Sequence, residues 1–444
     1  MFTNKQLRRL VIPLVLEQLL SVTIGMADTM MVASCGEAAV SGISLVDTIS
    51  VLLIGMFGAM ASGGAVTVAQ YIGKKDREKV ARASNQLFLS VGALALVFMA
   101  LALIANRQIL TLIYGDIDGE VMRNARIYFY FNAVSFPFLG IYNSGAALFR
   151  AVGNSKVSMQ VSLFSNLLNV AGNALFIYGF QMGVSGAALS TLISRSLSAL
   201  VICFLLLHKG DVPVSRKIGI DKPILHKILY IGVPNGLENS IFQVGKILVS
   251  SLTASFGTAA ITANAVTGNV GNFQLIPAGA VGAAIITVVG QCVGAGEYRQ
   301  ARRYLFRLLR TAYFFVAGIG VFLIIFREPI CGLYQLSPET TQLTGLLLVY
   351  NCICCMLVHP LSFALPNGLR AAGDVRYTMV VAIASMWVCR IGLAYLLAKG
   401  LNLRVLGVYI AMTVDWLVRG ICFVTRVLTG KWEKYMGVLT KEET

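Results

Sequence analysis

Five acidic residues fall inside long apolar stretches of the sequence, and these carboxylates are the first candidates for chemistry. They are Glu17, Asp28, Asp47, Glu238 and Asp415. A charge held within the hydrocarbon region of a membrane is costly, so such residues usually serve ion binding, proton transfer or substrate recognition. We therefore expect cation or proton chemistry at some of these positions.

Glu17 and Asp28 lie on one face of the first apolar stretch. They are eleven residues apart, which at 100° per residue places them about 20° apart around a helix. Such a face suits cation binding, or proton exchange through a carboxylate of raised pKa. For Glu17, hydrogen bonding to neighbouring helices is the alternative interpretation.

A group of polar residues follows later in the first half of the chain, and its members are Tyr128, Asn132, Asn166, Asn169 and Asn173. The last three follow spacings of three and four, so they form one stripe on a helix. Amide oxygens beside a carboxylate suit a hard cation such as Na⁺, which makes Asp28, Asn169 and Asn173 a candidate Na⁺ site. A proton-linked hydrogen-bond network and simple bonding between helices fit the stripe equally well.

The second half of the chain carries different chemistry. Glu238 and Lys246 are eight residues apart, about 80° around a helix, so we expect no direct pair between them. Both are candidates for a substrate cleft, together with Asp47 and His359. Lys246 suits a carboxylate or another anionic group, whereas a lone His such as His359 is more often a satisfied core residue.

Three arginines inside apolar stretches have structural interpretations. Asp415 and Arg419 are four residues apart, a spacing that favours an ion pair within one helix. Arg195 and Arg390 are expected to hold helices together rather than to bind substrate.

The elements that position these residues must be membrane-spanning helices. The chain has 444 residues, of which 57% are hydrophobic and 13% charged, whereas soluble domains carry roughly 25% charged residues. Runs of about 20 apolar residues match a helix that crosses a bilayer. Twelve spans are predicted, at about 10–32, 40–70, 84–105, 122–147, 157–180, 183–208, 228–254, 260–292, 305–326, 341–366, 379–398 and 405–428.

The net charge of +16 gives information on topology. If the N-terminus is cytoplasmic, few basic residues fall outside the membrane on the opposite side: Arg107, Arg123, Arg126, Arg327, Lys399 and Arg404. This is the positive-inside bias, so we expect both termini in the cytoplasm and a place in the plasma membrane. It also argues against a nucleic-acid partner.

The two halves of the chain are diverged copies. One constant shift along the chain aligns Pro13 with Pro234 and Glu17 with Glu238, and matches continue from Gly36 with Gly257 to Gly73 with Gly294. Asp28 instead meets Val249, so the copies differ in chemistry. An even number of spans in each copy predicts a parallel repeat.

The motifs at these positions resemble the MATE (multidrug and toxic compound extrusion) family of the MOP flippase superfamily. They are Pro13 with Asp28, the sequence from Gln70 to Gly73, the sequence from Leu369 to Asp374, and the sequence from Gly183 to Arg195. The resemblance implies an all-α integral membrane protein with twelve transmembrane helices in two six-helix bundles, V-shaped with a central cleft. It also implies that Asp28 is the coupling carboxylate.

Two positions depart from the patterns of the family's branches. DinF-type members carry Asn-x-x-x-Asp on the fifth helix, where this chain has Asn169 and Asn173. NorM-type members place an acidic residue in the tenth helix, but residues 341–366 contain no Asp or Glu. The chain therefore matches neither branch cleanly, and both H⁺ and Na⁺ stay open as the coupling ion.

The sequence thus predicts a secondary antiporter. It would export small amphipathic, cationic compounds in exchange for H⁺ or Na⁺ by alternating access. A flippase for a lipid-linked saccharide is the alternative. No ATP-binding motif is present, and we expect no enzyme activity, no cofactor and a monomer whose partners are its substrate and the bilayer. The expected organisation is 1–208 for the N-terminal lobe, 209–227 for a cytoplasmic linker, 228–428 for the C-terminal lobe and 429–444 for a tail.

Proline residues inside the spans are expected to permit bending, since a mid-helix proline frees a backbone carbonyl. Pro13 lies just before Glu17 in the first span. We expect bending there to reshape the N-terminal cavity.

Overall fold

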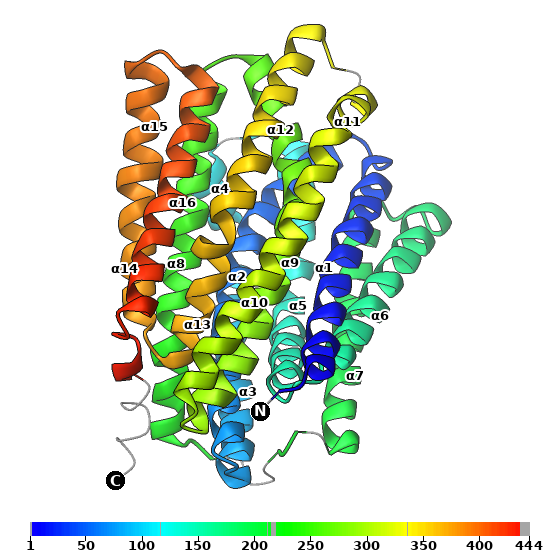
Figure 1. The fold of residues 1–444 in the computed structure, drawn as a ribbon. Helices are drawn as coiled ribbons and strands as arrows, with labels where there is room; N and C mark the ends of the chain where they lie inside the picture. Colours follow the sequence, from blue (N-terminus) through cyan, green and yellow to red (C-terminus); the bar gives the residue numbers. More distant parts are fainter. Residues whose placement is uncertain (1, 116, 211, 215–218, 335, 436–444) are drawn as a thin grey trace. The chain divides into compact units, whose positions relative to one another are not determined.

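The fold is helical throughout the part of the chain that the structure describes. The computed structural model describes residues 2–115, 117–210, 212–214, 219–334 and 336–435 (Figure 1). Its contacts divide the chain into two compact units, and the boundary lies between Gly236 and Leu237. That boundary falls inside one helix, α8 (Lys222–Ala254).

The N-terminal unit contains six long helical segments and one short helix, followed by the first part of α8. They are α1 (Asn4–Ala33), α2 (Glu37–Gly73), α3 (Arg77–Ile104), the short α4 (Asn106–Tyr114), α5 (Gly119–Ala151), α6 (Ser155–Asn173) continued by the π-helix η1 (Ala174–Gly179), and α7 (Gly183–Lys209).

The C-terminal unit contains the rest of α8 and five further long segments. They are α9 (Thr258–Gly294), α10 (Tyr298–Ile325) with the short α11 (Arg327–Leu333), the segment α12 (Pro338–His359), η2 (Pro360–Ala364) and α13 (Leu365–Ala372), the segment α14 (Val375–Ser385), η3 (Met386–Gly392), α15 (Leu393–Tyr395) and η4 (Leu396–Gly400), and finally α16 (Arg404–Leu428). Three of these pieces are π-helices, which commonly mark functional positions.

The sequence repeat is reproduced in the ends of the helices. The shift that aligns Pro13 with Pro234 carries the bounds of α2 and α3 onto those of α9 and α10, and the start of α4 onto that of α11. Gly36 and Gly257 precede α2 and α9 with φ angles of 99° and 96°. A positive φ is adopted readily only by glycine, so both copies keep it where the chain turns.

Polar residues outside the apolar stretches determine where several helices begin. Thr3 accepts a hydrogen bond from the Gln6 backbone N–H over 3.3 Å, and the Gln6 side chain accepts one from the Thr3 N–H. Asp76 caps α3 through the Lys79 N–H at 3.0 Å. These bonds satisfy backbone donors that the first turn of a helix leaves free, so the helices start in the polar connections.

A different helix is central in each unit. In the N-terminal unit α5 packs against α2, α3 and α7, while α1 packs against α6. In the C-terminal unit α9 packs against α10, α12 and α13. Close approach needs small residues: a Cβ on Gly42 of α2 would lie 2.8 Å from the Ala125 backbone nitrogen of α5.

The predicted spans correspond to twelve long helical segments among the described residues. Ten of them are long and apolar enough to cross a membrane. The other two, α5 and α8, have 33 residues each and carry more polar and charged residues. The short helices α4 and α11 occupy stretches that the sequence indicated only as connections.

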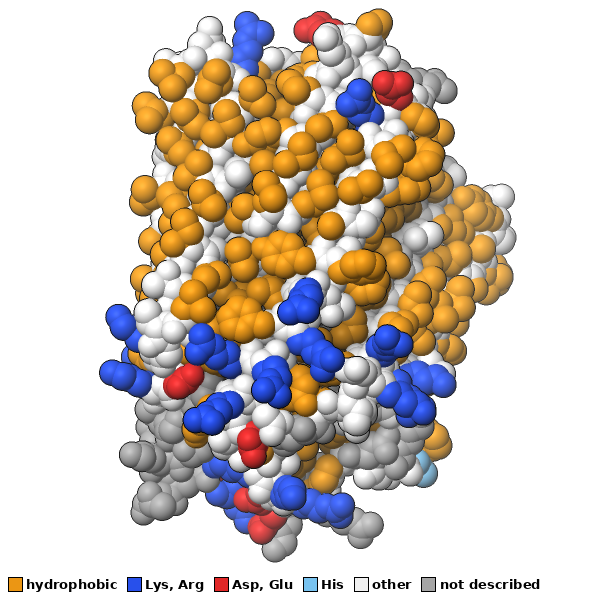
Figure 2. All heavy atoms as spheres, in the orientation of Figure 1, with side chains coloured by type: hydrophobic (Ala, Val, Ile, Leu, Met, Phe, Trp, Pro, Cys, Tyr) orange, Lys and Arg blue, Asp and Glu red, His pale blue; other side chains and the backbone are white. Residues whose placement is uncertain are grey.

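The surface agrees with a lipid environment. Figure 2 shows apolar side chains covering the middle of the face formed by α10, α12, α14 and α16, with Lys and Arg gathered at the end where α10 begins and α16 ends. Exposed large apolar side chains on these helices include Phe314, Phe322, Leu357, Val380 and Ile421. The chain is a multi-pass membrane protein.

Candidate functional site

Asp28 and Asn173 meet in the N-terminal unit. Asp28 projects from α1, and the Asn173 side-chain amide donates a hydrogen bond to its Oδ1. Asn173 is the last residue of α6 before the π-helix η1, and its side chain is fully buried. The Asn173 Oδ1 has no hydrogen-bond partner in the structure, so a buried acceptor oxygen lies beside a carboxylate.

A second carboxylate is close enough to act on the first. Tyr128 of α5 hydrogen-bonds the side chain of Asp47 on α2, and the charges of Asp47 and Asp28 interact. Arg195 of α7 interacts electrostatically with both carboxylates. Its guanidinium donates to Asn132 Oδ1 over 2.6 Å and to Ser135 Oγ over 2.7 Å. Arg195 is therefore held in place by neutral partners and faces two acidic groups.

The asparagine stripe divides between two neighbours. The Asn169 amide donates to Thr191 Oγ1 over 3.3 Å and to Ser190 Oγ over 3.4 Å, which ties α6 to α7. Asn166 donates to Ser21 Oγ of α1 over 3.2 Å. In this conformation Asn166 and Asn169 connect helices, and Asn173 alone of the stripe bonds the Asp28 carboxylate.

Glu17 has partners of its own, away from Asp28. Ser158 donates to its Oε2 over 2.9 Å, and Arg150 Nη1 lies 3.8 Å from Oε1. Eleven residues correspond to about 16 Å along a helix axis, so Glu17 and Asp28 share a face of α1 without forming one site.

Glu238 repeats this arrangement in the C-terminal unit. Arg370 Nη2 donates to both carboxylate oxygens of Glu238, each over 2.7 Å, and the side chains of Arg370 and Glu238 are only 11% and 13% exposed. Sequence reasoning placed Glu238 in a substrate cleft. The structure places it in this ion pair and not among the residues that line the cavity of the C-terminal unit.

The cavity of the C-terminal unit has a volume of about 500 Å³. It is lined by residues of α8, α9, α12, η2, η3 and α16. Lys246 and His359, both candidates for a substrate cleft, line it. Aromatic side chains form much of the apolar wall: His359 stacks on Phe363 with 4.4 Å between ring centroids and meets Trp416 edge-on at 5.3 Å. The volume suits a small ligand.

The predicted pair of Asp415 and Arg419 is confirmed. Arg419 Nε lies 2.9 Å from Asp415 Oδ1 and also donates to Ser385 Oγ over 2.8 Å. Ser385 in turn donates to Asp415 over 2.7 Å. Arg390 Nη1 approaches the other oxygen of Asp415 to 3.6 Å. These groups are buried and form one network, and Arg390 is the member of it that lines the cavity.

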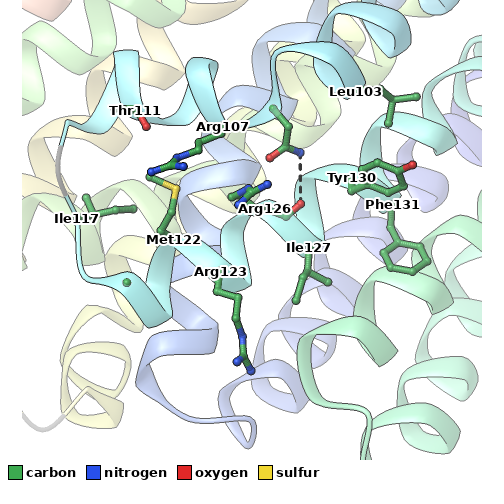
Figure 3. A pocket seen from close by; sticks show the side chains of 12 residues that line it. Leu103, Arg107, Thr111, Ile117, Met122, Arg123, Arg126, Ile127, Tyr130 and Phe131 are labelled. Atoms are coloured by element: carbon green, nitrogen blue, oxygen red, sulfur yellow. Dashed lines mark hydrogen bonds between the residues drawn. The ribbon is translucent and has the colours of Figure 1, made fainter.

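Another cavity, of about 820 Å³, lies between α4 and α5 (Figure 3). Three arginines line it, Arg107, Arg123 and Arg126. Arg107 comes from α4 and reaches over Met122, whereas Arg123 and Arg126 come from α5, and Arg123 points away from Arg107. All three arginines are exposed. Exposed basic side chains are easily satisfied by water, so we assign no site to them.

Sequence reasoning missed the basic and hydroxyl partners of the carboxylates. Arg150 and Arg370 were visible as a match between the two halves, and each follows its glutamate at nearly the same distance along the chain. That constant separation was the available signal for a repeated ion pair. Ser158 and Ser385, which donate to Glu17 and Asp415, carried no such signal, because hydroxyl residues are common throughout membrane helices.

Comparison with known proteins gives one family for both halves of the chain. A family model described as MatE matches residues 13–175 and again residues 234–396. The second range starts at Pro234, the residue that the internal repeat aligns with Pro13, and both ranges have the same length.

Individual relatives resemble the chain over nearly its whole length. It is 25% identical to the "Probable multidrug resistance protein NorM" of Thermotoga maritima, with 99% of this chain and 95% of the relative covered. It is 26% identical to the "Uncharacterized transporter YisQ" of Bacillus subtilis, with 95% and 93% covered.

Solved structures share the fold. One is described as the outward-facing conformation of a multidrug resistance MATE family transporter, with a TM-score of 0.89, 19% identity, and 98% of this chain and 96% of the other covered. Another is described as MATE in the bent conformation, with a TM-score of 0.88, 19% identity, and 99% and 96% covered.

Proposed function

Because the chain belongs to the MatE family of transporters, we propose that it is a secondary antiporter that exports small amphipathic compounds in exchange for H⁺ or Na⁺. It works as a monomer in the plasma membrane with both termini in the cytoplasm. Relatives named as multidrug resistance proteins support export of several compounds rather than one. The basic end of the C-terminal unit (Figure 2) supports the orientation, since Lys and Arg favour the cytoplasmic side.

The observation that carries the proposal is the contact between Asp28 and Asn173. A carboxylate inside a membrane helix beside a buried, unpartnered amide oxygen offers two hard oxygen ligands to a cation, and the same carboxylate can take up a proton. Asp47 increases the negative charge of the region, and Arg195 limits it. Binding of either ion neutralises Asp28 and weakens its attraction for Arg195, which links ion occupancy to the packing of α1.

Pro13 provides a place where α1 can bend when an ion binds at Asp28. Proline has no N–H, so the carbonyl of Arg9, four residues earlier, loses its partner inside the helix. Ser155 at the start of α6 donates to this carbonyl over 3.2 Å and to the Leu10 carbonyl over 2.7 Å. Hydrogen bonds therefore connect α1 to α6 at two places, at Asp28 and at the backbone carbonyls of Arg9 and Leu10 just before Pro13.

The acidic residues of the two units bear on the charge of the substrate. The sequence favoured cationic compounds, and in the N-terminal unit Asp28 and Asp47 are consistent with that prediction. Glu238 no longer supports it, because Arg370 neutralises its charge. A substrate with a cationic group would compete with the coupling ion for the region around Asp28.

The test uses everted membrane vesicles that contain the full chain. Uptake of ethidium and of carboxyfluorescein is followed while a Na⁺ gradient or a proton gradient is imposed alone. We expect accumulation of at least one dye with one of the two gradients, and loss of that accumulation in Asp28→Asn. Glu120→Gln, which changes an exposed acidic residue at the start of α5, is the matched control. Equal accumulation by wild type and Asp28→Asn contradicts the ion site.

A further inference from the structure

Three residues that line the cavity of the C-terminal unit each carry a buried nitrogen atom without a hydrogen-bond partner. The atoms are Arg390 Nη1, His359 Nδ1 and Trp416 Nε1. The exposed fractions of these residues are 8%, 6% and 4%. Buried polar groups in proteins are almost always hydrogen-bonded. The guanidinium of Arg390 and the indole N–H of Trp416 are hydrogen-bond donors, whereas the role of His359 Nδ1 depends on the tautomer of its ring. The two donors at one cavity indicate a position for a ligand that accepts hydrogen bonds.

The charges around this cavity favour an anion. Lys246, which is exposed, and Arg390, which is buried, both line it, and their charges repel each other. No Asp or Glu is present among its lining residues. Asp415 does not line the cavity: Arg419 and Ser385 donate to its Oδ1, and its Oδ2, which has no hydrogen-bond partner, lies 3.6 Å from Arg390 Nη1.

Arg390 is positioned but incompletely paired. Its guanidinium lies over the Phe242 ring at 5.2 Å and near the Trp416 ring at 6.0 Å. Such contacts stabilise an arginine and fix its plane. Its Nη1 lies 3.6 Å from Asp415 Oδ2 without forming a hydrogen bond. Taking a guanidinium out of water costs several kcal/mol unless hydrogen bonds compensate for it, and here the compensation is partial.

The backbone at these residues is also unusual. Arg390 lies in the π-helix η3, and His359 immediately precedes the π-helix η2. A π-turn shifts the side chains that follow it around the helix axis, and such turns are frequent at functional sites. Arg390 thus reaches the cavity from a π-helix, and His359 lies at the last position before one.

We propose that this cavity binds the acidic head group of an amphipathic substrate, a carboxylate or a similar oxyanion, with Arg390, Trp416 and Lys246 as its recognition residues. The guanidinium donates to the oxyanion, the indole N–H adds a second donor, and Lys246 supplies a further positive charge. Phe242, Leu275, Phe363 and Met412 surround the apolar body of the ligand. Export of this ligand rests on the proposed function, whereas its binding to the cavity does not.

Binding is tested on the purified full chain with three compounds that share one apolar body. These are 4-phenylbutyrate, its neutral amide and 4-phenylbutylamine, with affinity measured by isothermal titration calorimetry in detergent. We expect the carboxylate to bind at least about tenfold more tightly than the amide, since a hydrogen bond to a charged group is stronger than one to a neutral group. The amine should bind more weakly than the amide.

Three variants locate the site. Arg390→Gln, Lys246→Gln and Trp416→Phe should each reduce the preference for the carboxylate over the amide, and Arg107→Gln, in the exposed cavity of the N-terminal unit, should leave it unchanged. Lys246→Gln and Trp416→Phe keep the assay informative if Arg390→Gln does not fold. Equal affinity for carboxylate and amide, or an unchanged preference in both Lys246→Gln and Trp416→Phe, overturns the proposal.

Two further binding measurements identify the source of the anion and separate this proposal from the antiport proposal. Competition by phosphatidylglycerol, with phosphatidylcholine as the neutral control, identifies an acidic lipid head group as the source of the anion, whereas a lack of competition identifies a free organic acid. Asp28→Asn should bind 4-phenylbutyrate like the wild type. Failure of ion-driven transport with intact binding therefore contradicts only the antiport proposal, and failure of binding with intact transport contradicts only this one.

Discussion

Arg370 donates hydrogen bonds to both carboxylate oxygens of Glu238, and each bond is 2.7 Å long. At the equivalent position of the first half, Arg150 Nη1 lies 3.8 Å from Glu17 Oε1, which is a looser ion pair. Each unit thus ties its first helix to the end of a later helix with one ion pair. Because both carboxylates are neutralised, Asp28 is left as the acidic group that distinguishes the first helices of the two halves.

The first prediction concerns the stability of this pair. Glu238→Gln leaves the guanidinium of Arg370 without a counter-charge in a largely buried place, so we expect a loss of about 3–5 kcal/mol of unfolding free energy. The measurement is thermal unfolding of the purified protein in detergent. The double variant Glu238→Gln with Arg370→Gln should recover much of the loss. A double variant less stable than the single one contradicts the explanation.

The second prediction concerns the ligand role of Asn173. Asn173→Ala removes both the hydrogen bond to Asp28 and the free amide oxygen, so the concentration of coupling ion needed for half-maximal transport should rise about tenfold. It is measured in vesicles by varying Na⁺ or pH, according to the driving ion. Asn166→Ala, on the same stripe but bonded to Ser21, is the control and should change the value less than about twofold.

The third prediction concerns Pro13. Pro13→Ala restores the N–H that can bond the Arg9 carbonyl, so α1 should become straighter and the protein more stable, by up to about 3 kcal/mol. Transport should slow because the helix bends less readily. Vesicle transport rates and thermal unfolding measure the two effects. Ser155→Ala keeps the proline but removes the contact to α6, so it should lower stability. Fast transport by Pro13→Ala contradicts the bending role.

The fourth prediction concerns the packing of α2 on the first part of α8. A Cβ on Gly63 would lie 2.7 Å from the Ile228 carbonyl oxygen and 2.8 Å from the Gly232 nitrogen. Because these are backbone atoms, Gly63→Ala must separate the helices, at a cost of about 1–3 kcal/mol. Thermal unfolding measures it. Gly92→Ala meets no atom within 4 Å and should be neutral or stabilising, since alanine is the better helix former.

Much of the fold was predictable from patterns along the chain. Long apolar runs define the spans, since every transmembrane backbone group must be satisfied within a helix. The internal repeat then assigns corresponding helices to two copies, and the ends of α2 and α9 agree residue for residue. The short helices α4 and α11 were not predicted, because they are too short to carry an apolar period.

The candidate site was predictable in its residue types and less so in its partners. Asp28, Asn173 and Lys246 are unusual for their surroundings, so the sequence alone identified them. It could not identify which asparagine of the stripe would meet Asp28, because the three share a helix face and the neighbouring helix determines which one lies opposite. Tertiary packing placed Asn173 there, and paired Asn166 and Asn169 elsewhere.

The sequence by itself determined a twelve-span membrane protein with two copies of one fold and unequal chemistry, because membrane insertion and duplication leave patterns that are local or periodic. Only the tertiary structure decided that Glu238 is neutralised and that Arg390, which lines a cavity, is incompletely paired. Whether a buried charge is satisfied depends on atoms brought to it from distant helices, and spacing along the chain carries no record of those distances.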